Sequence, residues 1–285
     1  MTKRTQADPD GRMPLMDHLR ELRSRLFKAV LGLVAGGIVG WVFFPPIWDF
    51  LKKPYTRIPA EHCIDAKCDL VVHGIFDGFF IHLKVALIVG AVISSPVWLY
   101  QIWAFVAPGL YKRERRWTYV FMIAAVPLFG LGAALAYLTM DKGLSIFIGL
   151  APGDSIVLVG VQDYLGYAQA MLLIFGLTFE LPLFIVVLNV AGVLTHDRIR
   201  RSRRMLLFGI FVFAAVATPS QDPFTMLALA LPTVFLFEVA EILAYFHDRR
   251  KAARPDPYEG LSDDEASPLD LAALDAELEP GEPRR

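Results

Sequence analysis

The stretch QIWAFVAPGLYKRERR, residues 101–116, decides the fold because an aromatic and apolar run ends there in a charged cluster. Four of its last five residues are basic, and Glu114 is the single acid among them. Apolar runs that stop at basic clusters are typical of helices that end at a membrane surface. The composition agrees, since 55% of the 285 residues are hydrophobic and the mean hydropathy is +0.47. The sequence therefore predicts an all-α integral membrane protein.

Six weakly charged runs are candidates for membrane-spanning helices. A helix needs about 20 mostly apolar residues to cross the hydrocarbon, and four of the runs reach that length. The first is short unless Lys28 extends to the interface, and the apolar part of the fifth, residues 205–217, covers only about 20 Å at the rise of an α-helix. The six runs are residues 29–44, 85–111, 117–140, 164–195, 205–221 and 223–246.

Basic residues are distributed unequally between the segments that separate these runs. Twenty Lys or Arg lie in residues 1–28, 107–117, 195–204 and 247–254, against five in residues 45–75, 141–163 and 219–223. This asymmetry predicts six transmembrane helices with both termini in the cytoplasm, in the cytoplasmic membrane. The formal net charge of −1 gives no support for a nucleic-acid partner.

The chain divides into three parts by composition. Residues 1–26 form a cytoplasmic amphipathic segment, and residues 27–246 form the transmembrane domain. Residues 247–285 form a cytoplasmic tail with ten acids after residue 254, a composition that predicts disorder. We expect no cleavable signal peptide, because a charged segment precedes the first apolar run.

Signatures of hydrolases, metalloproteases and nucleotide-binding enzymes are absent from the sequence, so we predict no enzyme activity, no metal and no cofactor. Cys63 and Cys68 fall in the first extracytoplasmic connection, where an oxidising compartment would permit a disulfide. We favour that pairing over two free thiols. His62, beside them, does not complete a set of metal ligands.

Two acids stand among basic residues at the predicted cytoplasmic surface. Glu21 lies in MDHLRELRSRLFK, residues 16–28, where leucines spaced by three and four predict an amphipathic helix with Glu21 on its wet side. A salt bridge to Arg25, one turn later, would explain Glu21 structurally, and Glu114 would relieve repulsion between its basic neighbours. The functional alternative is that both carboxylates bind guanidinium groups in bidentate fashion, which would favour paired arginines.

An apolar groove is predicted beside Glu114. Pro108 and Gly109 interrupt the second long run, and this interruption can open a groove at its cytoplasmic end. Phe105 and Leu110 flank the interruption and would contact an apolar peptide there. Lipid anchoring is the competing explanation for these two side chains.

Four further polar residues occupy or border the apolar runs. Glu180 near the middle of the fourth run is a functional candidate, or a polar group that holds helices together. Lys84 extends toward the outer side, and a pairing with Glu180 has no support. Glu238 lies near the cytoplasmic end of the last run. Asp222 precedes Pro223 in the pattern of a helix N-cap.

Several ordered motifs resemble those of TatC, the six-span subunit of the twin-arginine translocase, over about residues 14–246. They are HLRELRSRL at residues 18–26, SSPVWLYQIWAFVAPGLYKRERR at 94–116, FGLTFELP at 175–182, and Thr218, Pro219 and Asp222. The two cysteines and the acidic tail are not general features of that family.

The resemblance implies a receptor for twin-arginine signal peptides in a concave, glove-like bundle. It implies an oligomeric complex, in membrane lipid, with single-span TatA- and TatB-type proteins that exports folded proteins using the proton-motive force. The arginines would meet Glu21 and Glu114, and the site would be shaped by Arg23, Phe105, Pro108 and Leu110. Glu180, Lys84 and Asp222 match polar residues of the family.

A proton-coupled transporter or channel for a small solute is the alternative. Glu180, Lys84 and Glu238 would then form a proton relay through the bundle. This alternative predicts that Glu180→Gln abolishes solute transport while substitutions of Glu21 and Glu114 have little effect.

Overall fold

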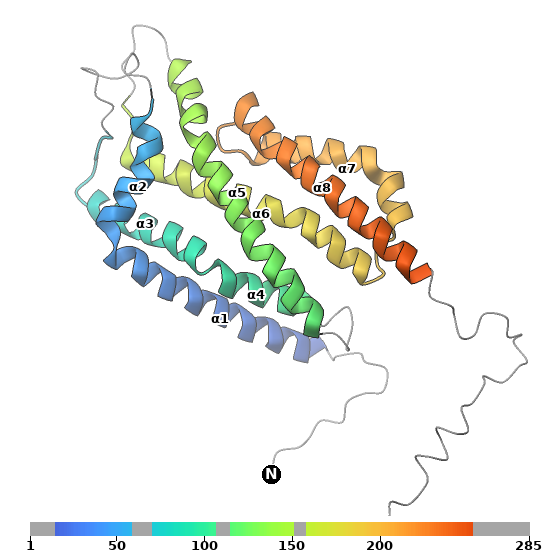
Figure 1. Ribbon diagram of the computed structural model, residues 1–285. Coiled ribbons are helices and arrows are strands. Elements are labelled where there is room, and N and C mark those ends of the chain that lie inside the picture. The colour runs from blue at the N-terminus through green and yellow to red at the C-terminus, as the bar shows by residue number, and fades with distance from the viewer. Residues whose placement is uncertain (1–14, 59–69, 107–114, 151–157, 253–285) are drawn as a thin grey trace, which may run out of the picture. The chain divides into compact units, whose positions relative to one another are not determined.

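The computed structural model describes residues 15–58, 70–106, 115–150 and 158–252 (Figure 1). Within these ranges the chain forms eight helices, and its one isolated bridge pairs Val71 with Gly160. Residues from Tyr245 onward belong to a second compact unit, described as far as Ala252. The helices are α1 (Leu15–Val42), α2 (Phe44–Thr56), α3 (Asp77–Ile93), α4 (Ser95–Val106), α5 (Arg115–Gly149), α6 (Val161–Val190), α7 (His196–Ala217) and α8 (Pro223–Ala252).

Four helices, α1, α5, α6 and α8, contain stretches long and apolar enough to cross a membrane. Helices α3 and α4 together make a fifth candidate span, with a bend of 57° between them. Helix α7 does not join this group, since its first half carries five arginines, and this agrees with the short apolar part predicted for the fifth run. The protein is thus an all-helical membrane protein with several apolar helices.

The second apolar run, which the sequence predicts as one span, is broken between α3 and α4. The break falls at Ser94 and Ser95, whereas the predicted interruption at Pro108 and Gly109 lies outside the described residues. Pro96 has no N–H and cannot continue the hydrogen bonding of α3. The indole N–H of Trp98 donates to the carbonyl of Ala91 at 2.8 Å, which pairs one of the carbonyls near the end of α3.

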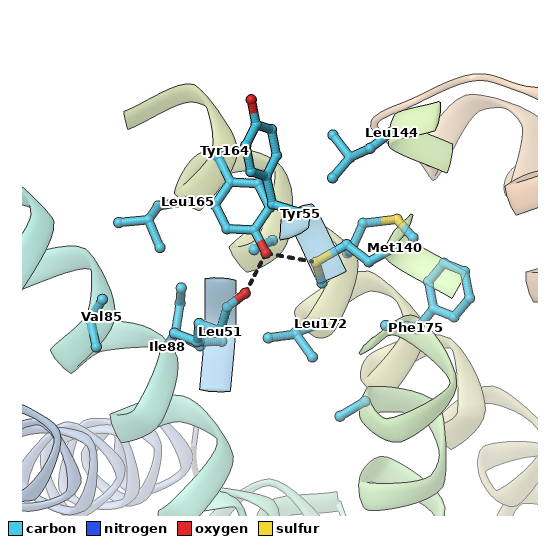
Figure 2. Close-up of a cluster of buried hydrophobic side chains, with 14 of the residues drawn as sticks. Leu51, Tyr55, Val85, Ile88, Met140, Leu144, Tyr164, Leu165, Leu172 and Phe175 are labelled. Carbon is cyan, nitrogen blue, oxygen red and sulfur yellow. Dashed lines mark hydrogen bonds between the residues drawn. The ribbon is translucent and has the colours of Figure 1, made fainter. Parts of the chain in front are cut away.

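Helix α2 lies in a segment that the sequence analysis treated only as a connection. Its apolar residues recur at helical spacing, and two prolines occupy its first turn. Leu51 and Tyr55 are buried, and the hydroxyl of Tyr164 in α6 donates to the carbonyl of Leu51 (Figure 2). The rings of Tyr55 and Tyr164 meet edge to face at 5.6 Å. These contacts fix α2 against α6.

The core at this contact continues between α5 and α6. Met140 of α5 lies beside the Tyr164 hydroxyl, with its sulfur 3.9 Å from the oxygen (Figure 2). The buried apolar side chains around them come mainly from α2, α3, α5 and α6, and include Val85, Ile88, Leu165, Leu172 and Phe175.

Glycines let helix pairs approach to backbone contact. A Cβ added at Gly36 of α1 would lie 3.0 Å from the Cα of Gly90 in α3. A Cβ added at Gly132 of α5 would lie 2.5 Å from the carbonyl oxygen of Phe175 in α6. Backbone atoms cannot move aside as a flexible side chain can, so these positions admit no larger residue without separating the helices. The α1–α3 and α5–α6 contacts therefore depend on glycine.

We expect Gly132→Ala to lower the free energy of unfolding by about 1–3 kcal/mol, because the methyl group overpacks the α5–α6 contact. Gly130→Ala, two residues earlier in α5, is the matched control, since an added Cβ there has no neighbour within 4 Å. Alanine favours helix over glycine, so this control should be at least as stable as the wild type. Unfolding in mixed micelles of increasing SDS content measures both. Equal stability of the two variants would contradict the close contact at Gly132.

Candidate functional site

The carboxylate of Glu21 is held by an arginine of its own helix. In α1, the Oε1 atom of Glu21 accepts hydrogen bonds from Nε of Arg25 at 2.9 Å and from Nη2 at 2.5 Å. Both side chains are only about a quarter exposed, at 24% for Glu21 and 21% for Arg25. The pairing one turn apart is the one the sequence suggested. The side chain of Glu21 faces α4, across a cavity lined by polar side chains.

A cavity of about 400 Å³ separates this part of α1 from α4. Among the described lining residues, Glu21 is the one with a carboxylate, and Tyr100 and Gln101 of α4 supply polar groups opposite. The lining residues are Glu21, Ser24, Arg25, Lys28, Tyr100 and Gln101. The predicted apolar stripe of α1 faces away, with Leu19, Leu22 and Leu26 exposed. This arrangement suits a helix whose apolar side meets lipid and whose polar side meets the protein.

The first turns of α1 also contact the end of α4. The imidazole of His18 stacks on the ring of Phe105, with ring centroids 4.5 Å apart and an interplanar angle of 18°. Arg23 is exposed on α1. The structure therefore brings Glu21, Arg23 and Phe105 to one end of the α1–α4 pair. Glu114, Pro108 and Leu110 lie outside the described residues, as do Cys63 and Cys68.

Glu180 is buried in α6 with 8% of its surface exposed, and neither carboxylate oxygen has a hydrogen-bond partner among the described residues. The indole N–H of Trp103 in α4 is also buried without a partner there. The Trp103 ring packs against Phe184, one turn after Glu180, at a centroid distance of 5.5 Å. Unpaired polar groups in a core are costly. Glu180 and Trp103 are thus two buried polar groups at the contact between α4, α5 and α6.

The structure does not bring Lys84, Glu180 and Glu238 together as a relay. The Nζ atom of Lys84 donates to the carbonyl of Gln162, in the first turn of α6, at 2.8 Å. Glu238 of α8 accepts two hydrogen bonds of 2.7 Å from one nitrogen of Arg203 in α7. Lys84 and Glu238 therefore have other partners.

Arg203 is a residue that the sequence analysis did not single out. Its Nε atom also lies 3.7 Å from the carboxylate of Glu241, so one guanidinium joins two acids of α8 to α7. Glu238 and Glu241 share a helix face by their spacing of three. The cluster of arginines at residues 198–204, followed by two acids spaced by three in the last apolar run, is the sequence signal that could have predicted this contact.

Asp222 caps α8, as the sequence predicts. Its Oδ1 atom accepts a hydrogen bond from the backbone N–H of Thr225 at 2.8 Å, and Pro223 begins the helix. Burial acts to raise the pKa of Asp222. Hydrogen bonds from the Ser220 and Thr225 side chains and from the backbone of Thr225 and Phe224 outweigh it, so the pKa lies below its ordinary value of 3.8.

We expect Asp222→Ala to lower the free energy of unfolding by about 0.5–2 kcal/mol, because the cap is lost. Since folding lowers the pKa of Asp222, the carboxylate stabilises the protein fully above about pH 4 and loses this contribution as the pH falls through the folded pKa. Asp222→Asn is the matched variant, because its side-chain oxygen can still cap the helix but does not titrate. Melting temperatures of both variants and the wild type between pH 2 and pH 6 test the effect, and a wild-type advantage over Asp222→Asn that persisted at pH 2 would contradict it.

Comparison with known proteins places the chain in a family. Residues 17–232 match the family model described as Sec-independent protein translocase protein (TatC). A protein of that description from Frankia casuarinae is 49% identical over 94% of this chain and 76% of its own. Another from Corynebacterium kroppenstedtii is 39% identical over 95% of this chain and 71% of its own.

A solved structure described as the twin arginine translocase receptor TatC in DDM has the same fold. It superposes with a TM-score of 0.66 and is 30% identical, covering 80% of this chain and 99% of the solved chain. The family match spans most of the helical part described above, and the most similar of these relatives shares nearly half of its residues with this chain. The chain belongs to the TatC family of Sec-independent protein translocase proteins.

Proposed function

We propose that this chain, as a subunit of a Sec-independent protein translocase, is the receptor for twin-arginine signal peptides. It passes folded proteins across the cytoplasmic membrane together with TatA- and TatB-type subunits, using the proton-motive force. It acts as a transport subunit and not as an enzyme. The family match and the description of the solved relative as a receptor support this proposal.

The observation that carries the proposal is the half-buried carboxylate of Glu21 beside the α1–α4 cavity. A carboxylate and a guanidinium fit each other in bidentate geometry, whereas a lysine ammonium is a point charge that cannot make the same pair. We assign the second arginine to Glu114. Arg23, Phe105, Pro108 and Leu110 shape the surrounding surface, and Phe105 contacts the apolar part of the peptide.

The proposed topology has six spans in a concave bundle, with both termini in the cytoplasm. The bent α3–α4 pair forms the second span, and α7 forms a short fifth. The basic residues of α7 then lie on the same side of the membrane as Glu21. The short α7 requires either a locally thinner bilayer or cover from neighbouring helices.

Labelling tests the topology directly. Cys63 and Cys68 are first replaced by Ser, and then His73→Cys or Asp197→Cys is introduced, since both positions are exposed. We expect a membrane-impermeant maleimide to label the His73→Cys protein in intact cells, and to label the Asp197→Cys protein only after lysis. The reverse pattern would contradict the proposed orientation. Labelling of both proteins in intact cells would contradict the proposed number of spans between residues 73 and 197.

Peptide binding tests the receptor site. We expect a fluorescent peptide with paired arginines to bind the purified protein at least about tenfold more tightly than its Lys-Lys counterpart, which corresponds to about 1.4 kcal/mol. The double variant Glu21→Gln, Glu114→Gln should lose this preference, because the carboxylates that match a guanidinium are gone.

The control for this experiment is Asp49→Asn. Asp49 pairs with Lys52 at 2.7 Å within α2, so the variant also removes a carboxylate from an intrahelical ion pair, but away from the α1–α4 cavity. It should keep the preference for arginine. Equal binding of both peptides by the wild type and the double variant would exclude this site and favour the transporter alternative.

A further inference from the structure

The carboxylate proposed to receive an arginine already holds one. Both hydrogen bonds to Oε1 of Glu21 come from the single guanidinium of Arg25, through Nε and Nη2. An arginine from outside would need the same carboxylate. Bidentate pairing with the incoming arginine uses both oxygens of the carboxylate, so the two cations compete for Oε1.

The charge of the cavity adds to this competition. Among the described residues of its lining there are one acid, Glu21, and two bases, Arg25 and Lys28, so this part of the lining carries a formal charge of one positive unit. A cationic ligand meets a repulsive surface while Arg25 stays in place. Once Arg25 releases Glu21 and its side chain turns outward, the cavity presents an unpaired carboxylate.

Release of Arg25 requires no change in the backbone. Arg25 is one turn from Glu21 on the same helix, and its long side chain has several rotatable bonds. Intrahelical ion pairs of this spacing are weak, because little is gained over hydration of the two charges. An exchange of one guanidinium for another also conserves the number of charge-assisted hydrogen bonds.

We propose that Arg25 is an internal competitor for the incoming arginine and sets the affinity of the site. This inference rests on the proposed function, because it assigns a role within the same receptor site. A protein whose binding-competent state is populated only in part binds every ligand more weakly by that fraction. Arg25 thus lowers the affinity for all cationic peptides by one factor. The preference for arginine over lysine comes from the two parallel hydrogen bonds that a guanidinium, but not an ammonium, can donate to the Glu21 carboxylate.

The test compares Arg25→Gln with two controls in the same peptide-binding assay. We expect Arg25→Gln to raise the affinity for the twin-arginine peptide by about three- to tenfold, as when the pair leaves Glu21 free for about a third to a tenth of the time. The Lys-Lys peptide should gain by the same factor. Lys28→Gln removes one charge from the same cavity and leaves the pair intact, so its gain should be less than about twofold and should vanish at high salt.

Arg25→Lys separates the hydrogen-bonding geometry from the charge. This variant keeps the charge of the cavity but replaces the planar guanidinium with a point charge that pairs less well with a carboxylate. We expect an affinity between those of the wild type and Arg25→Gln. Affinities of Arg25→Gln and Lys28→Gln that rise equally would overturn the proposal, since charge alone would then be responsible. A loss of binding in Arg25→Gln would also overturn it, because Arg25 would then support the ligand.

A titration with methylguanidinium distinguishes this proposal from the receptor function. The probe carries the cation without a peptide, and the carboxylate carbon of Glu21 reports its binding by NMR in protein labelled at glutamate. We expect tighter binding of methylguanidinium to Arg25→Gln than to the wild type or Lys28→Gln. If Arg25→Gln binds methylguanidinium more tightly but neither it nor the wild type prefers the twin-arginine peptide, the role of Arg25 as a competitor is supported and the receptor function is contradicted. If Arg25→Gln shows no gain in methylguanidinium binding, the role of Arg25 is contradicted, even where the preference for the twin-arginine peptide is observed.

Discussion

The structure depends on one constraint, which is that backbone N–H and C=O groups inside hydrocarbon must be paired within the protein. The apolar runs satisfy it by forming helices, and helices then associate only as closely as their side chains allow. Glycine at the α1–α3 and α5–α6 contacts lets the two backbones approach each other closely. The close approach adds van der Waals contacts, which matter in a membrane because the hydrophobic effect contributes little to the association of helices there. The break between α3 and α4 is tolerated because Trp98 supplies a donor to the end of α3.

The buried carboxylates that are described follow the same constraint to different degrees, and one oxygen of Glu241 also has no hydrogen bond. Asp222 is saturated with hydrogen bonds, and Glu241 lies near the guanidinium of Arg203. Glu180 has neither oxygen paired, and the unpaired N–H of Trp103 belongs to the same helix contact. Glu180 and Trp103 therefore place two polar groups inside the contact between α4 and α6, where a functional role and a polar link between helices both remain open explanations.

Much of this architecture was predictable from the sequence, because the length of an apolar run and the charges that flank it can be read locally along the chain. The long apolar runs predicted α5, α6 and α8, and Asp222 with Pro223 predicted the start of α8. The bend at Ser94 was not predicted, since a proline in an apolar run can begin a helix or kink one. Helix α2 was missed because its apolar residues are few and its segment reads as a connection. Its period was nevertheless visible in Phe44, Trp48, Leu51 and Tyr55.

The candidate site was predicted only in part, because it depends on which helix faces which. Glu21 and its pairing with Arg25 follow from the spacing within α1. The cavity opposite Tyr100 and the stacking of His18 on Phe105 depend on contacts between α1 and α4. The spacing of apolar residues within one helix does not tell which other helix it contacts. The spacing of the leucines places Glu21 on the polar side of α1, but it does not tell which helix this side faces.

The closest backbone contacts of α1 lie far from Glu21 along the helix. The backbone of α1 meets that of α3 at Gly36 and Gly40, and Glu21 stands fifteen residues before Gly36, about 22 Å along the helix axis. A tilt of about 5° about these glycines would carry the carboxylate about 2 Å from α4 at that lever length. The stacking of His18 on Phe105 opposes such a tilt. The width of the cavity therefore depends on two contacts that do not line it, and a substitution at either one can change it.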